Sequence, residues 1–189
     1  PLTADLLPRE FLFRYCNLDC MMHPAAWLVP RAVAEAAGPW NETLSLNDDG
    51  EYFARVVLAS HRVVHCGEAR SYYRSGLPGS LSAQHSRRHL ESALHAAVLI
   101  GRHLRAASDD EAASRTAAAN LLQRFAYDYY PREPDLVARA ERAARELGGS
   151  HLAPLGGRSF QFTRRLLGWK LARRLQLALG RHPNVHPAR

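Results

Sequence analysis

Cysteine is scarce in this chain and long apolar runs are absent from it. The first fact argues against a disulfide-stabilised protein, and the second argues against a membrane-spanning helix. Three cysteines are an odd number without the spacing of a disulfide framework, which favours a reducing cytoplasm. The longest apolar stretch, 96–100, is far too short to cross a bilayer. Cys16, Cys20 and His23 lack a second ligand pair, and no Gly-x-Ser-x-Gly elbow occurs, so we expect neither a zinc site nor a Ser-His-Asp hydrolase.

Acidic residues are missing from residues 147–189, which hold seven Arg and one Lys. Residues 1–146 carry 17 Arg and all 18 acidic residues, so the formal charge of +7 comes from the tail. Within the tail, 160–179 is expected to form one helix with leucines on one side and cations interspersed. Three uses remain open: docking on the protein's own acidic surface, lying on an anionic membrane, or contacting nucleic acid without a specific motif.

The apolar pattern divides the chain into three expected segments: 1–85, 86–149 with helices only, and 150–189, the basic tail. In the first segment we predict helices over 30–37 and from residue 48 to about His61. Two short strands, 63–66 and 69–73, and a closing loop at 76–82 are expected to follow. The middle segment has three apolar stripes at helical spacing: Leu90, Leu94, Ala97, Gly101 and Leu104; Ala118, Leu122, Phe125 and Tyr129; and Leu136, Ala140, Ala144 and Leu147.

Three carboxylates, Asp48, Asp49 and Glu51, fall within four positions where the chain is expected to turn from a loop into a helix. The unpaired amide hydrogens and positive dipole end of a helix N-terminus favour anions. Ordinary capping is therefore one explanation, because Ser45 with Asp48 fits a capping pair and Asn47 fits as a cap as well. The other explanation is chemistry, and the flanking motifs favour it.

The motifs on either side of this acidic cluster occur in a recognisable order. Upstream are AWLVPR at 26–31 and AGPWNE at 37–42; downstream are RVVHC at 62–66, SYYRSG at 71–76 and PGSLS at 78–82. In this order and at these spacings, residues 20–85 resemble the acceptor-side half of a bacterial family-2 glycosyltransferase. Such enzymes move a sugar from a nucleotide diphosphate to a hydroxyl group.

The resemblance implies roles for five residues. Asp49 aligns with the general base, which removes a proton from the acceptor hydroxyl as it attacks the anomeric carbon. Trp40, Asp48 and Glu51 would contact the acceptor. Arg74 would either pair with donor phosphate, in place of a family histidine that is absent here, or face solvent. We expect the helix N-terminus to keep Asp49 ionised, although neighbouring carboxylates raise one another's pKa.

The donor-binding part of that family is not found in these residues. No Asp-x-Asp motif and no Gly-rich phosphate loop occurs. The resemblance implies that the complete enzyme uses a divalent metal, Mg or Mn, which this chain does not bind by itself. We therefore expect the N-terminal nucleotide-binding half to be missing. The expected fold is α/β or α+β, mostly helical: the acceptor-side half of a GT-A-type fold followed by a helical region.

Two functions remain. The first is a glycosyltransferase fragment that is expected to be inactive alone. Its complete form would bind a nucleotide-sugar donor and a glycan or lipid-linked acceptor in the cytoplasm. The basic tail could then make a peripheral contact with the inner face of the membrane. The second is a noncatalytic helical binding module whose acidic motif only caps a helix and whose tail contacts membrane or nucleic acid. An in-frame nucleotide-binding segment with an Asp-x-Asp ahead of Pro1 would decide for the enzyme.

Overall fold

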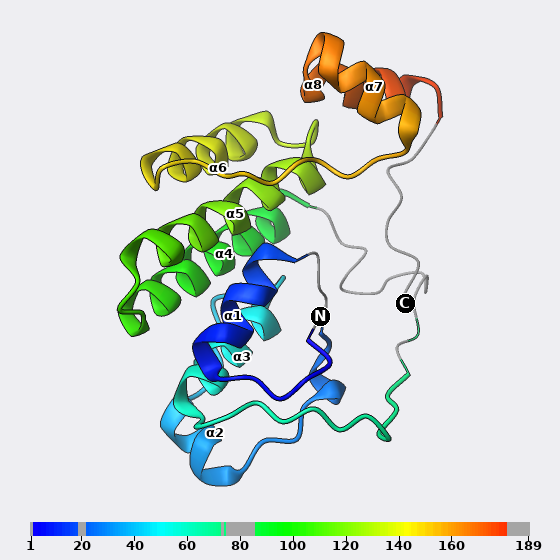
Figure 1. The fold of residues 1–189 in the computed structure, drawn as a ribbon. Helices are drawn as coiled ribbons and strands as arrows, with labels where there is room; N and C mark the ends of the chain where they lie inside the picture. Colours follow the sequence, from blue (N-terminus) through cyan, green and yellow to red (C-terminus); the bar gives the residue numbers. More distant parts are fainter. Residues whose placement is uncertain (1, 19–21, 73, 75–85, 181–189) are drawn as a thin grey trace.

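The protein is all-helical in the part of the chain that the structure describes. This computed structural model describes residues 2–18, 22–72, 74 and 86–180. None of the helices in these ranges is long and apolar enough to cross a membrane. In chain order the elements are α1 (Pro8–Asn17), the short 3-10 helix η1 (Pro24–Ala26), α2 (Arg31–Ala37), α3 (Asp48–Ala59), α4 (Arg87–Ala107), α5 (Glu111–Tyr129), α6 (Pro134–Glu146), α7 (Arg158–Leu167) and α8 (Trp169–Ala178) (Figure 1).

One hydrophobic core joins five of these helices. Helices α4, α5 and α6 lie side by side; α1 packs against α5, α4 and α3, and α3 packs against α4 (Figure 1). Leu90 and Ile100 of α4 and Leu136 of α6 are fully buried in this core. Leu12 of α1 and Val57 of α3 belong to the same cluster. Residues on both sides of the expected boundary at 85 therefore share one core.

The three helices predicted after residue 85 are confirmed, and local chemistry explains their ends. The Asp110 side chain caps α5 by accepting the N–H of Ala113 at 2.9 Å. Helix α6 is followed by Gly148, whose φ of +105° is readily adopted only by glycine. Gly101 permits the close packing of α4 on α5, because a Cβ there would lie 2.8 Å from the Cβ of Ala118.

The expected α/β or α+β fold of GT-A type is wrong. The described residues contain eight α-helices and no β-strand, so 63–66 and 69–72 do not form the predicted strands; Tyr73 and the loop 76–82 lie outside the described residues. Val63 makes an isolated bridge with Leu6, with two backbone hydrogen bonds of 2.9 Å. Val64 is 68% exposed and Tyr72 is 93% exposed. A strand needs neighbours along its whole length to pair its backbone groups and cover its apolar side chains, and within the described residues the backbone pairing here is limited to the single bridge between Leu6 and Val63.

The basic tail contains two helices where one was predicted. Gly168, with a φ of +78°, ends α7 and begins α8, so the two helices form a hairpin at one end of the molecule (Figure 1). The Trp169 ring packs edge-on against Tyr127 at 4.8 Å and Tyr130 at 5.1 Å between ring centroids. Lys170 donates a 2.7 Å hydrogen bond to Glu141 of α6. These contacts dock the start of α8 on the helical body.

Candidate functional site

The acidic motif opens α3 without the predicted capping bonds. Asn47 adopts a left-handed conformation, with φ 60° and ψ 26°, and its side chain makes no capping hydrogen bond. Its amide oxygen instead lies over the first turn, where a Cβ on Gly50 would be only 2.3 Å away. The Ser45 hydroxyl is buried and makes no hydrogen bond with the described residues. Capping by Ser45 or Asn47 therefore does not account for the motif.

Helix α4 holds the loop that leads into this motif. The Ser92 hydroxyl accepts the backbone N–H groups of Ser45 at 2.7 Å and Leu46 at 3.1 Å. The same hydroxyl donates to the Leu46 carbonyl oxygen at 3.2 Å. Three hydrogen bonds to one partly buried side chain fix the chain immediately before α3. The acidic residues therefore begin a helix whose preceding loop is tied to α4.

Asp49 lies at the start of α3, partly buried. Burial raises the pKa of its carboxyl group, and the neighbouring charge of Asp48 acts in the same direction. The hydrogen bond that Asp49 Oδ1 accepts from the Gly50 N–H at 2.8 Å and the nearby His23 lower the pKa, but burial dominates and leaves it above its ordinary value. The helix N-terminus was expected to keep Asp49 ionised, and burial acts against this effect by raising the pKa. A carboxylate with a raised pKa is a stronger base.

An aromatic pair lies one helical turn from the acidic residues. Tyr52 follows Asp48 by four positions and Asp49 by three, so it shares a side of α3 with them. The rings of Trp40 and Tyr52 stack at 4.3 Å with an angle of 11° between their planes. Trp40 remains 39% exposed. A partly exposed Trp40 ring stacked on a residue one turn from two carboxylates could offer apolar contact to the C–H groups of a sugar ring, and the carboxylates could accept hydrogen bonds from its hydroxyls.

The Trp27 and Phe53 rings support this pair from below. Their planes stack at 4.8 Å with an angle of 9°, and Phe53 also meets the Trp40 ring edge-on at 6.1 Å. Phe11 of α1 packs edge-on against Trp27 at 5.5 Å. Phe53 and Phe11 are buried, so the exposed pair rests on the core of the protein. These ring contacts connect Trp40 to the core.

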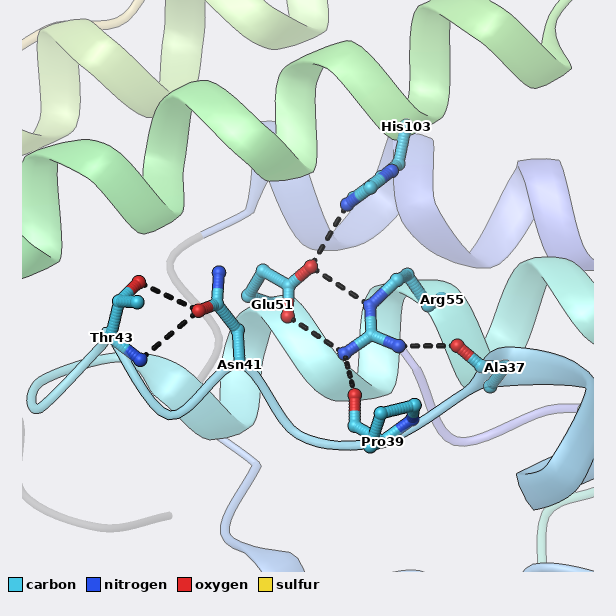
Figure 2. A network of polar contacts seen from close by, with 7 residues as sticks. All are labelled: Ala37, Pro39, Asn41, Thr43, Glu51, Arg55 and His103. Atoms are coloured by element: carbon cyan, nitrogen blue, oxygen red, sulfur yellow. Dashed lines mark hydrogen bonds and ion pairs between the residues drawn. The ribbon is translucent and has the colours of Figure 1, made fainter.

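Glu51 faces the interior and holds the site together. Its carboxylate accepts hydrogen bonds from Arg55 at 2.8 and 3.0 Å and lies 2.9 Å from His103 Nε2 of α4 (Figure 2). The Arg55 guanidinium also donates to the carbonyl oxygens of Ala37 and Pro39, which precede Trp40. One ion-pair network thus joins α3, α4 and the end of α2. It fixes the backbone that carries Trp40.

The charge of Glu51 is maintained in spite of its burial. Burial acts to raise the pKa of its carboxyl group, but hydrogen bonds from Arg55 and His103 and their charges outweigh it and lower the pKa below its ordinary value. The Glu51 side chain is only 3% exposed, and the Arg55 side chain is 18% exposed. An acceptor cannot reach a carboxylate this deeply buried. Its position is that of a structural ion pair, unlike the acceptor contact expected from the sequence.

The structure places three of the five expected site residues in or near the first turns of α3. Asp48 and Asp49 lie in the first turn, Trp40 stacks on Tyr52 one turn further along, and Glu51 is buried in the core. Arg74 is exposed in a segment without helix or strand. Within the described ranges it makes no hydrogen bond or ion pair with the acidic motif. The donor-phosphate role of Arg74 therefore remains a prediction, and Arg74 takes no part in the contacts that form the site.

Three residues that organise the site were not singled out from the sequence. Arg55 lies one turn after Glu51, and that spacing is the local signal of an ion pair on a helix. Ser92 and His103 lie on α4, at separations of 46 and 52 residues from the groups they bind. Only the packing of α3 on α4 brings them there. No feature of the local sequence marks either residue as a partner.

Metal ligands do not cluster in the described part of the chain. No group of three or more His, Cys, Asp or Glu side chains there has the arrangement to hold a metal ion. Burial raises the pKa of the Cys16 thiol to about 12, so it stays protonated in the core, while Cys66 is exposed elsewhere. Cys20 lies outside the described residues. The chemistry available at α3 is therefore that of carboxylates and aromatic rings.

Comparison with known proteins adds no family to this description. No protein-family model, curated protein or solved structure matches the chain. A function has to be argued from the site, because folds host many unrelated activities and sites carry the chemistry.

Proposed function

We propose that the start of α3 is the acceptor side of a sugar-transfer site, with Asp49 as the general base. The observation that carries this proposal is the stacking of Trp40 on Tyr52, which follows Asp49 by one helical turn on α3. A partly buried carboxyl group with a raised pKa therefore lies one turn from a residue that holds an exposed aromatic ring. Sugar rings present both C–H faces and hydroxyl groups, and this surface suits both.

The proposed chemical step needs one proton acceptor on this chain. The acceptor hydroxyl forms a bond to the anomeric carbon of the donor, and the bond from that carbon to the nucleoside diphosphate breaks. The hydroxyl proton passes to the Asp49 carboxylate, and the diphosphate leaves with the electron pair of the broken bond. Because burial raises the pKa of Asp49, its carboxylate accepts this proton more readily than an exposed aspartate would. Asp48 is placed to accept a hydrogen bond from another sugar hydroxyl.

The proposal assigns no binding site for the nucleotide-sugar donor to this chain. The described residues offer no ligand cluster for the Mg or Mn that a diphosphate donor would bring, and no step is assigned to a metal. The chain is expected to be inactive alone and to act with a separate nucleotide-binding part. Calorimetric titration of the isolated chain with nucleotide sugars should detect no micromolar binding. Micromolar affinity of the isolated chain for a nucleotide sugar would contradict the expectation that a separate part binds the donor.

A noncatalytic binding module is the second candidate. The helical body and its basic α7–α8 hairpin are compatible with it, because both features occur in interaction domains as well as in enzymes. The two candidates differ in what they require of Trp40. The sugar-transfer proposal needs this side chain to bind a saccharide, whereas the binding module gives it no ligand.

Saturation-transfer NMR with oligosaccharides, and with soluble analogues of the sugar headgroups of lipid-linked acceptors, tests the proposal. We expect ring-proton signals from at least one class of saccharide, with affinity in the millimolar range typical of a single small site, about 4 kcal/mol. Trp40→Ala should remove these signals. Trp169→Phe, an aromatic change on the distant side of the molecule, is the matched control and should retain them. Equal signals in both variants, or none in the unaltered chain, would contradict the acceptor site.

A further inference from the structure

The α7–α8 hairpin exposes more large apolar side chains than any other element. Thirteen large apolar residues are exposed in the described part of the chain, and six of them are Phe162, Leu166, Leu167, Leu171, Leu175 and Leu179. The remaining exposed residues are scattered over several elements. Isolated exposed leucines need no explanation, but a concentration of them on two adjacent helices does.

Each helix of the hairpin has one face turned inward and one turned outward. In α8, Ala172 and Arg173 are buried, whereas Leu171 and Leu175, spaced by one turn, are exposed. In α7, Phe160 alone is buried. Phe162 and Leu166 are also spaced by one turn and exposed. The two helices therefore bury one side against each other, with Arg173 over the Phe160 ring, dock on the body through Trp169 and Lys170, and leave an apolar side uncovered.

The cations of the hairpin divide between two uses. Lys170 pairs with Glu141, and the buried Arg173 lies over the Phe160 ring at 4.6 Å and donates to the Leu155 carbonyl at 3.0 Å. These two groups hold the hairpin in place. Arg158, Arg165 and Arg174 are exposed, and 158–178 contains no acidic residue. The exposed charge of the hairpin is therefore entirely positive.

We propose that the outer side of the α7–α8 hairpin lies on an anionic lipid surface. Helices that carry leucine and phenylalanine beside arginine bind such surfaces, because apolar side chains enter the headgroup boundary while guanidinium groups meet lipid phosphate. A second copy of the chain fits less well, since joining two such hairpins would bring their exposed arginines together without an acidic residue of either hairpin. Nucleic acid would use the arginines but leave the leucines exposed to water. This inference is independent of the sugar-transfer proposal.

Vesicle sedimentation of the full chain tests the proposal. Vesicles of phosphatidylcholine mixed with an equal amount of phosphatidylglycerol are compared with phosphatidylcholine alone, at low and high salt. We expect strong binding to the anionic vesicles that weakens as salt screens the charges, and little binding to the neutral ones. Phe162→Ser with Leu166→Ser should weaken anionic binding at least about tenfold, since two large apolar contacts are lost. Arg165→Gln should weaken it about fivefold.

Matched control variants distinguish binding through the hairpin from nonspecific binding through other exposed residues. Leu28→Ser removes a leucine that is 99% exposed on another part of the molecule, and Arg102→Gln removes an exposed charge from α4. Both should bind anionic vesicles as the unaltered chain does. Absence of anionic binding, equal binding to neutral vesicles, or equal losses in control and hairpin variants would each overturn the proposal. So would loss in Arg165→Gln with full binding in the apolar double variant, which would indicate a purely electrostatic partner such as nucleic acid.

Discussion

Glu51 and His103 meet across two packed helices, with His103 Nε2 2.9 Å from Glu51 Oε1 although 52 residues separate them in the chain. Glu51 also binds Arg55, which in turn holds the backbone ahead of Trp40 (Figure 2). The buried network and the exposed site therefore share one helix, α3. Asp49 serves the outer surface of that helix, and Glu51 serves the inner one.

Removing the Glu51 carboxylate should destabilise the protein strongly. Glu51→Ala leaves Arg55 without its carboxylate partner, and the expected loss is about 2–3 kcal/mol, below the value for a fully buried pair because Arg55 is 18% exposed. Glu51→Gln should cost less, since an amide oxygen still accepts one hydrogen bond. Urea unfolding followed by circular dichroism measures both. Glu10→Ala, which breaks an exposed pair with Arg14, is the matched control and should change stability by less than about 1 kcal/mol.

Acid should weaken the fold through Glu51. Its pKa is lowered in the folded protein, so at intermediate pH the unfolded chain binds more protons and stability rises with pH. This contribution is fully present above the ordinary glutamate pKa of about 4.3 and is lost as pH falls through the lower pKa of the folded protein. Urea unfolding at successive pH values should show a smaller loss on acidification in Glu51→Gln than in the unaltered chain. An identical dependence in both would contradict the assignment.

Adding a single methyl group between α4 and α5 should lower the stability of the protein, because the two helices approach closely there. Gly101→Ala would place a Cβ 2.8 Å from that of Ala118, and we expect a net loss of about 1–2 kcal/mol, because overpacking outweighs the gain in helix propensity. Adding Ala118→Gly removes the opposing methyl and should recover part of this stability. Thermal unfolding of the two single variants and the double variant measures the coupling. Strictly additive effects would show that the two helices do not meet at these residues.

The helices of the body could be predicted from the sequence, and the reasons are local. Leu90, Leu104 and Leu136 fall in apolar segments whose ends have clear cap or stop residues, so helix positions and buried faces follow from spacing. The strands could not be predicted in the same way. The segment containing Val64 and Tyr72 has strand-like composition, but a strand depends on partners that the described residues do not provide.

The candidate site was predicted only in part, for a similar reason. The run of carboxylates marks the start of α3, and helical spacing separates Asp49 from Glu51. Which side faces the core depends on α4, whose Ser92 and His103 come from a distant part of the chain. Glu51 therefore looked like a surface acidic residue from the sequence and is a buried ion-pair partner in the structure. Gly168 likewise divides a tail whose apolar spacing had predicted one helix.

Asp49→Asn should separate activity from stability. Because burial raises the pKa of Asp49, its ionised form costs folding free energy at neutral pH, and a neutral asparagine should raise the melting temperature. In an enzyme that supplies the donor site, the same change should reduce turnover by about 100-fold or more, since an amide cannot accept the proton. Asp48→Asn should reduce turnover less. The reverse order of turnover, with both variants folded, would show that Asp49 is not the base.

The central claim is that Asp49 is a partly buried base on a saccharide-binding surface, and titration of its carboxyl carbon by NMR tests this most directly. In the folded chain the midpoint should lie above the ordinary aspartate pKa of about 3.9, because burial disfavours the charged form. A saturating saccharide that binds at Trp40 should raise the midpoint further by excluding water, and Trp40→Ala should abolish that increase. A midpoint at or below the ordinary value, or one that no bound saccharide changes, would contradict the account.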